Sequence, residues 1–357
     1  MAIILNILLF LAGFILLIKG ADYFVKSASN IARTMGISEF VIGLSLVAIG
    51  TSLPELGAAV VASLEKQSPI ILGAVIGSNI SNICLITGIT ALISTISINK
   101  TVLKRDSYVM LFAGVVLYIF IFNLNITRVE AGVLLILYLA YLGFITKKQY
   151  KRQSDFTNYL KYFITFRYIR AIKNQLLKQT DKTINSIQNK KKLNPRQIKD
   201  NKKKTIFLVR NISIFLISSF AIFLGARFIV DETIFFGDML NISKTIIALT
   251  AIALGTSLPE LGVTISAVRK GLSNIVMGNI IGSSIANIFL IVGVSGLISP
   301  LTSTLTTIYY TLPFMLITGI IFGFFIYTGR KINKLEGVML IFIYILFIIS
   351  LVFIGGR

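Results

Sequence analysis

The chain has 357 residues, of which 55% are hydrophobic and only 14% are charged. Soluble domains carry about 25% charged residues, so the composition predicts an all-α polytopic membrane protein. The net charge of +21 falls mostly in loops, where it sets topology or touches anionic lipid, and we expect no nucleic-acid partner. A single cysteine excludes an internal disulfide, and the absence of histidine removes the usual proton relay and zinc ligand.

Apolar runs predict ten transmembrane helices, five on each side of a basic segment. No basic region precedes the first run, so it is interpreted as a membrane helix that ends before Lys19 and not as a signal peptide. The ten predicted helices cover residues 1–18, 38–63, 70–94, 107–124, 128–146, 206–230, 242–268, 274–299, 305–328 and 335–355. The chain then divides into a first five-helix repeat (1–146), a basic loop (147–205) and a second repeat (206–357).

The basic loop contains only three acidic residues, Asp155, Asp181 and Asp200. Aromatic and basic residues alternate from Phe156 to Lys173, which favours one amphipathic helix that faces lipid, with a solvated linker as the alternative. The polar residues 179–204 are predicted to be disordered. We expect the loop to contact anionic lipid.

The distribution of positive charge predicts the orientation. If the basic loop is cytoplasmic, the segments assigned to the inside hold 30 of the 35 Lys and Arg residues. Those assigned to the outside hold the other five, which are Lys66, Arg128, Arg227, Lys244 and Arg357. The positive-inside rule therefore places both termini outside the cell.

The two halves are related by an internal repeat. At a constant offset of 205 residues, Leu44 to Ser94 aligns with Leu249 to Ser299 without a gap. Because five helices is an odd number, the two repeats must be inverted relative to each other in the membrane. Inverted repeats are typical of secondary transporters, whose site lies near the bilayer midplane where the repeats meet.

One stretch of eight residues, Gly-Thr-Ser-Leu-Pro-Glu-Leu-Gly, occurs in both repeats, at 50–57 and at 255–262. A carboxylate in an apolar helix costs roughly 2.5–3.5 kcal/mol at mid-bilayer, so Glu55 and Glu260 are candidate functional residues. Proline has no N–H, so the carbonyl group four residues earlier loses its partner and each helix is expected to kink or break. Carboxylate, hydroxyl and free carbonyl oxygens are ligands that Na⁺ and Ca²⁺ prefer.

The helices that follow carry a second set of polar residues. Ser78 and Asn82 are four apart and share a helix face, as do Ser283 and Asn287. Such residues can simply join helices by hydrogen bonds. That alternative does not account for the two glutamates, because no Lys or Arg lies within the four helix cores. The pattern therefore predicts a pair of cation half-sites.

These doubled motifs resemble those of the calcium/cation antiporter superfamily, which includes the prokaryotic sodium/calcium exchangers. The resemblance implies adjacent sites that hold one Ca²⁺ or several Na⁺ as transported ions, with no cofactor. Asn287 stands where many relatives carry aspartate, which argues against dependence on K⁺, and Ser284 replaces a usual asparagine. The implied ligands are Ala48, Thr51, Ser52, Glu55, Ser78, Asn82, Ala253, Thr256, Ser257, Glu260, Ser283 and Asn287.

The leading interpretation is antiport of Ca²⁺ against Na⁺ by alternating access, carried out by a single chain in the cell membrane. One Ca²⁺ would neutralise both glutamates, whereas an empty site would carry two buried charges while it changes sides. H⁺/Ca²⁺ antiport is the alternative, although its known branch follows the key glutamate with a histidine that this chain lacks. A cation channel would need a continuous pore, and an enzyme would need a nucleophile–base pair that the sequence does not offer.

Overall fold

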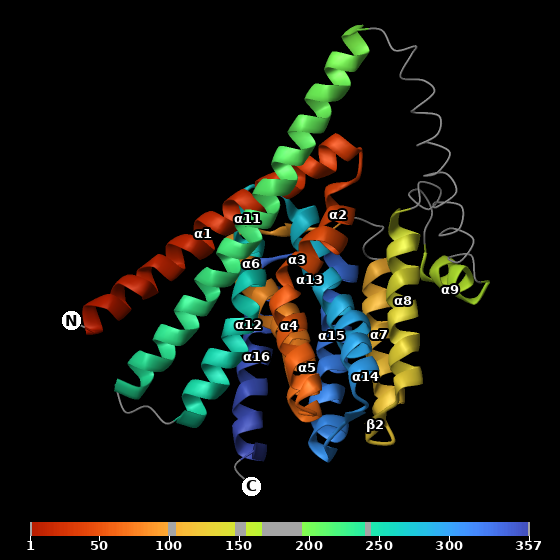
Figure 1. The fold of residues 1–357 in the computed structure, drawn as a ribbon. Helices are drawn as coiled ribbons and strands as arrows, with labels where there is room; N and C mark the ends of the chain where they lie inside the picture. The colour runs from red at the N-terminus through yellow and green to blue at the C-terminus, as the bar shows by residue number, and fades with distance from the viewer. Residues whose placement is uncertain (1, 99–104, 147–154, 166–194, 240–243, 356–357) are drawn as a thin grey trace.

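The computed structural model describes residues 2–98, 105–146, 155–165, 195–239 and 244–355. The described chain is almost entirely helical, and most of its helices run alongside one another in one bundle (Figure 1). Within the described ranges, seven helices are long and apolar enough to cross a membrane, and one bent pair makes an eighth candidate. The chain is therefore a multi-pass membrane protein.

The first half contains a broken helix. Ser52 (φ −88°, ψ 7°) separates Glu39–Thr51 from Leu53–Leu64, and the two pieces are bent by 47°. Pro54 begins the second piece, where its missing N–H is least costly. The elements are α1 (Ala2–Met35), α2 (Glu39–Ile42), the π-helical turn η1 (Gly43–Val47), α3 (Ala48–Thr51), α4 (Leu53–Leu64), α5 (Ser68–Ile80), the π-helical η2 (Ser81–Ile86), α6 (Thr87–Ile93), β1 (Ile96–Ser97), α7 (Ser107–Ile121), β2 (Asn125–Ile126) and α8 (Arg128–Thr146).

The second half repeats this order after a short helix. Its third span is again an α-helix that passes through a π-helical turn into a second α-helix, as the third span of the first half does. The elements are α9 (Phe156–Ile164), α11 (Pro195–Met239), α12 (Lys244–Arg269), α13 (Ser273–Ala286), η5 (Asn287–Val292), α14 (Gly293–Ile298), β3 (Leu301–Thr302), η6 (Thr307–Thr311), α15 (Leu312–Gly329), β4 (Lys331–Ile332) and α16 (Lys334–Gly355).

Two predicted boundaries are wrong, and one of the two prolines expected to kink or break its helix does not break it. α1 runs on to Met35, so Lys19 lies inside the helix, where a long side chain can extend its ammonium group toward water. α11 begins at Pro195, so residues 195–204 are helical and not disordered; lysine and glutamine are good helix formers and proline suits a first helical position. α12 is one continuous helix with Pro259 inside it, so the expected break occurs only in the first repeat.

The predicted amphipathic helix in the basic loop is present as α9, and part of its aromatic face packs against the helix bundle. Tyr159 and Tyr162 are buried, and the Tyr159 hydroxyl donates to the carbonyl oxygen of Leu137 on α8 at 3.1 Å. The rings of Tyr159 and Tyr162 also pack against Phe144. The two tyrosines of α9 are thus covered by α8. Residues 166–194 of the loop lie outside the described part of the chain.

Two short sheets join the halves. β1 pairs with β4 and β2 pairs with β3, both antiparallel, so each sheet takes one strand from each half. β2 lies at the same end of the bundle as the C-terminal end of α16 (Figure 1). β4 directly precedes the other end of α16, which spans 22 residues, so the two sheets lie at opposite ends of the molecule.

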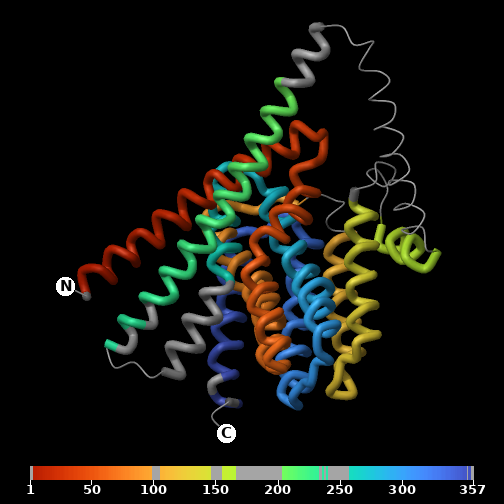
Figure 2. Tube along the Cα trace, viewed as in Figure 1, coloured from red at the N-terminus to blue at the C-terminus, as the bar shows by residue number. Residues whose placement is uncertain are grey.

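The first helix of each half packs against its counterpart. α1 and α11 lie side by side along much of their length, as the chain trace shows (Figure 2). A Cβ atom on Gly225 would lie 2.7 Å from the carbonyl oxygen of Gly13, so glycine permits this close approach. An amide hydrogen bond of 2.9 Å from Asn30 to Asn211 also joins the two helices.

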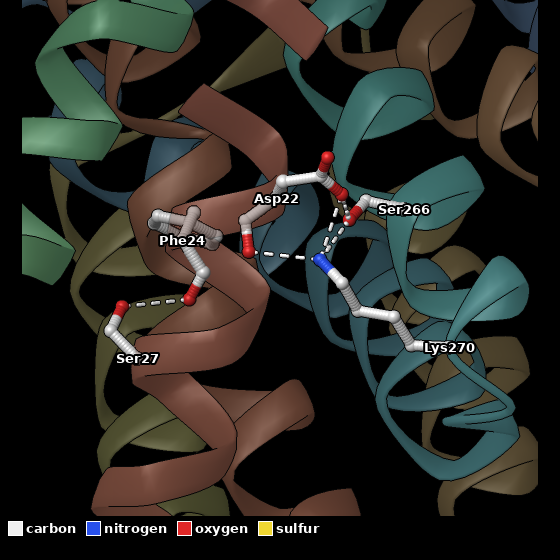
Figure 3. Close-up of polar contacts among 5 residues, drawn as sticks. All are labelled: Asp22, Phe24, Ser27, Ser266 and Lys270. Atoms are coloured by element: carbon white, nitrogen blue, oxygen red, sulfur yellow. Dashed lines mark hydrogen bonds and ion pairs between the residues drawn. The ribbon is translucent and has the colours of Figure 1, made fainter. Parts of the chain in front are cut away.

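α1 also contacts the C-terminal end of α12 through a small polar network (Figure 3). The Lys270 ammonium group donates to the Asp22 carboxylate at 2.8 Å and to the Asp22 carbonyl oxygen at 2.9 Å. Ser266 donates to the same carboxylate at 2.7 Å. These bonds hold α1 to the end of α12 that leads into α13.

The repeats differ in how tightly their third spans pack. All residues from Ile275 to Ala286 on α13 are buried, and α13 lies against α2, η1 and α3. A Cβ atom on Gly278 would lie 2.7 Å from the Phe40 carbonyl oxygen, whereas one on its counterpart Gly73 would have no neighbour within 4 Å. Gly73 is exposed. The second repeat is therefore closed where the first is open.

Candidate ion-binding site

The two copies of the eight-residue motif each reach the opposite repeat at the centre of the bundle. The Ser52 hydroxyl, at the break of the helix, donates to the Glu260 carboxylate at 3.2 Å. The Thr51 hydroxyl oxygen lies 3.5 Å from that of Ser283 on α13. All four side chains are buried. Residues more than 200 positions apart in the sequence thus form one polar cluster.

Both predicted carboxylates are buried in this region. Glu55 is 8% exposed and Glu260 is 3% exposed, and the two interact electrostatically. The Oε2 atom of each has no hydrogen-bond partner among the described residues. Buried carboxylate oxygens are normally paired, because leaving them unpaired costs free energy. Two such oxygens without partners fit a site that a cation completes.

A small cavity of about 60 Å³ brings three predicted residues together. Glu55 on α4, Ser78 on α5 and Asn287 at the start of η5 all line it. The Asn287 Oδ1 atom has no hydrogen-bond partner in the described structure. Its Nδ2 atom donates to Asn79 Oδ1 at 3.4 Å, which leaves Oδ1 free to accept or to bind an ion. Neutral and anionic oxygens therefore face one space.

The remaining predicted residues are placed less directly. Ala48 is buried, and its carbonyl oxygen accepts from the Ser52 N–H at 3.1 Å and from the Thr51 hydroxyl at 3.2 Å. Asn82 and Ser257 are buried, and Asn82 Nδ2 and Ser257 Oγ have no partner in the described part of the chain. Ala253 and Thr256 lie in the helical backbone of α12, but their side chains are outside the described structure.

The backbone carbonyl oxygen that the helix break leaves without its helical donor has a hydrogen-bond donor on a neighbouring helix. Pro54 cannot donate to the Gly50 carbonyl oxygen, and the Ser219 hydroxyl on α11 lies 3.4 Å from it. A larger cavity of about 560 Å³ separates these two helices and is lined mainly by apolar side chains, with both motif prolines among them. Neither glutamate lines it, so the smaller cavity is the one associated with the carboxylates.

The site contains polar residues that sequence reasoning missed. Asn279 on α13 accepts from Thr51 at 3.2 Å and donates to Thr264 at 3.2 Å. Asn79 bonds to Asn287. Asn279 and Thr264 have alanine at the equivalent positions of the first repeat, so comparing the repeats for identity does not reveal them. The sequence signal that could have revealed them is a polar residue in one repeat at a position where the other repeat has alanine.

Comparisons with known proteins agree on the family. The sequence profile of the sodium/calcium exchanger protein family matches residues 5–147 and 210–353. The chain is 42% identical to sodium/calcium exchanger MaX1 of Methanosarcina acetivorans, over 99% of this chain and 100% of that protein. It is 31% identical to the inner membrane protein YrbG of Escherichia coli, over 68% of this chain and 64% of that protein.

A solved structure also matches along nearly the whole chain. The sodium-calcium exchanger NCX_Mj superposes with a TM-score of 0.74 at 30% identity, covering 98% of this chain and 99% of that one. The described helices thus have the fold of that exchanger, and the doubled motif supplies the buried carboxylates of the central cluster. This chain belongs to the sodium/calcium exchanger protein family.

Proposed function

We propose that this chain moves Ca²⁺ and Na⁺ in opposite directions across the cell membrane, and that both ions bind the cluster around Glu55 and Glu260. Family membership supports the exchange of these two ions. The observation that carries the choice of site is the pair of buried glutamates whose Oε2 atoms have no partner in the described structure. The twelve residues named from the resemblance are proposed as its ligands.

The architecture that we propose is ten membrane crossings in two inverted repeats, at 1–146 and 206–357. Beyond the eight candidate spans, α7 and α12 are the helices that would complete five crossings in each half. The two-stranded sheets support inversion, because the equivalent strands β1 and β3 lie in different sheets, at opposite ends of the bundle, and each pairs with a strand of the other half. The broken helix is best tolerated in such a fold, where its free backbone faces protein.

The charge of the two glutamates favours coupled ion exchange over uncoupled ion leakage through the protein. Among the described residues there is no group of three or more Asp, Glu, Cys or His side chains that could hold a metal ion, so the cluster relies on two carboxylates and neutral oxygens. One Ca²⁺ or at least two Na⁺ would cancel the two negative charges. Moving the empty cluster through a closed state would bury both charges without a counter-ion, which is strongly unfavourable. Each crossing of the site therefore requires a bound ion.

We further propose that the small cavity is part of the path by which ions reach the cluster from one end of the molecule. It lies between α4 and α5 and is lined by alanine and isoleucine; Ile70 on this path is 61% exposed, while its counterpart Ile275 in the second repeat is fully buried. With both termini outside the cell and the 147–205 loop inside, the turn between α4 and α5 faces outward. We propose that the described state is open to the outside, that one chain suffices, and that the basic loop contacts anionic lipid.

Ion flux in liposomes tests this function. Purified protein is reconstituted, and uptake of radioactive Ca²⁺ is followed with an outward Na⁺ gradient at equal pH, or with a pH gradient at equal Na⁺. We expect uptake in the first case and none above empty liposomes in the second. Uptake driven by the pH gradient alone would favour H⁺/Ca²⁺ antiport, and uptake down a Ca²⁺ gradient without any counter-ion would favour a channel.

A further inference from the structure

The two half-sites differ at a pair of positions beside the cluster that contact each other. At the offset of 205 residues, Thr264 and Asn279 in the second repeat correspond to Ala59 and Ala74 in the first. Ala59 and Ala74 line the small cavity next to Glu55. Thr264 and Asn279 are instead buried and hydrogen bonded to each other at 3.2 Å. The second repeat thus has a polar pair where the first has open space.

The hydrogen bonds of this pair determine the direction in which Asn279 faces. The Thr264 hydroxyl donates its only proton to the Glu260 carbonyl oxygen at 2.6 Å. Its oxygen can therefore only accept from Asn279, so the amide group Nδ2 of Asn279 points to Thr264 and Oδ1 points away. Oδ1 lies 3.2 Å from the Thr51 hydroxyl, where it is placed to accept the proton of Thr51.

The position of that proton decides whether the oxygen atoms around Thr51 are free to bind a cation. A hydroxyl oxygen coordinates a cation only with its lone pairs, so its proton must point elsewhere. Thr51 has a second acceptor within reach, the Ala48 carbonyl oxygen at 3.2 Å, and that oxygen is itself a proposed ligand. When Asn279 takes the proton, Thr51 and Ala48 both keep a lone pair for the ion. When it does not, Thr51 donates to the Ala48 carbonyl oxygen, which already accepts from the Ser52 N–H, so neither lone pair of that carbonyl oxygen is left for the ion.

We propose that Asn279, oriented by Thr264, is a positioning residue that draws the Thr51 proton to itself and so frees the Ala48 carbonyl oxygen as a ligand of the first half-site. The proposal rests on the proposed function of the cluster. In the first repeat the position equivalent to Asn279 is Ala74, which has no side-chain oxygen to accept a hydroxyl proton. The first half-site is therefore the one prepared in advance for an ion, although the motifs are identical.

The test compares half-saturation constants with maximal rates in liposomes. Asn279→Ala should raise the Ca²⁺ half-saturation constant about tenfold, which corresponds to about 1.4 kcal/mol, with a smaller change in the maximal rate. Thr264→Val should also raise the Ca²⁺ half-saturation constant. Thr264→Ser, which keeps the hydroxyl group, should leave the constant at the value of the unmodified chain. The double variant Asn279→Ala/Thr264→Val should match Asn279→Ala alone, because Thr264 acts through Asn279.

Asn211→Ala is the matched control, since it removes a part-buried amide bond between α1 and α11 outside the cluster. It should leave the half-saturation constant within twofold of the unmodified chain. An unchanged constant in Asn279→Ala, or strictly additive effects in the double variant, would overturn the proposal. If the unmodified chain shows no Na⁺-dependent Ca²⁺ flux, the proposed function itself fails, which is a distinguishable result.

Discussion

The unequal packing of the two repeats can be tested with a pair of equivalent glycines. Gly278→Ala places a Cβ atom 2.7 Å from the Phe40 carbonyl oxygen and 2.8 Å from both Gly43 Cα and Leu44 N. All three are backbone atoms, which cannot rotate away. Ordinary contact begins near 3.4 Å, so α13 must move from its neighbour by about 0.7 Å. Gly73→Ala meets nothing within 4 Å.

The magnitude follows from the difference between the two variants. Each gains about 0.5–1 kcal/mol because alanine is the better helix former, and this gain is common to both. Overpacking a tight contact costs about 1–3 kcal/mol, and only Gly278→Ala incurs it. The free energy of unfolding should therefore be lower in Gly278→Ala than in Gly73→Ala by about 1–3 kcal/mol.

Thermal and denaturant unfolding of both purified variants in the same detergent measures this difference. Gly73→Ala should be at least as stable as the unmodified chain, and Gly278→Ala should be less stable than either. Equal stability in the two variants would refute the inference that α13 is packed against η1 while α5 is open. A less stable Gly73→Ala would show that the first repeat is closed at this position.

Two further predictions concern charge and orientation. Asn287→Asp adds a third carboxylate beside the Glu55 cavity, and like charges disfavour joint ionisation. Ca²⁺ exchange by this variant should therefore become dependent on pH or K⁺ without being lost. Identical flux profiles in the variant and the unmodified chain would place residue 287 outside the cluster. A cysteine at position 191 should react with an impermeant reagent only in opened cells, against a quiet background because Cys84 is buried; labelling of intact cells would invert the proposed topology.

Much of the fold was predictable because its signals are local. Apolar runs gave the membrane segments, and Pro54 gave the position of the broken helix, because a missing N–H acts within one turn. The same rule failed at Pro259, where α12 continues. Proline removes one hydrogen bond, and whether the helix then breaks depends on its neighbours. The sequence of the motif is identical in both repeats, so this difference comes from tertiary contacts.

The site was predictable where the repeat duplicated it. Glu55, Ser78 and Asn287 were found because each belongs to a motif that occurs twice, and they meet at one cavity. Asn279 was missed because its role depends on Thr51, which is 228 residues away in the sequence. Only the crossing of α3 and α13 brings them together.

A buried ion pair was likewise not visible in the sequence. Arg105 and Asp106 are adjacent residues directly before α7, and from the sequence they belong to a polar loop between two predicted helices. In the structure both are buried, the guanidinium lies 2.7 Å from the carboxylate, and Tyr141 on α8 donates to the same carboxylate at 2.8 Å. Burial of a charged pair depends on which helices cover it, and periodicity does not report that.

The most direct test of the central claim measures Na⁺-driven Ca²⁺ uptake by the variants Glu55→Gln and Glu260→Gln. The same substitution at a glutamate that caps a helix outside the cluster serves as the control. Glutamine keeps the shape but leaves Ca²⁺ with an unbalanced charge, and breaking a buried ion pair costs about 3–5 kcal/mol, so uptake at low Ca²⁺ should fall by more than about a hundredfold. The controls are Glu130→Gln and Glu336→Gln, whose carboxylates accept from the backbone N–H groups of Thr127 and Asn333 at helix starts. They should retain exchange. Robust uptake by either Glu55→Gln or Glu260→Gln, inserted as fully as the controls, would contradict the assignment of this cluster as the ion-binding site.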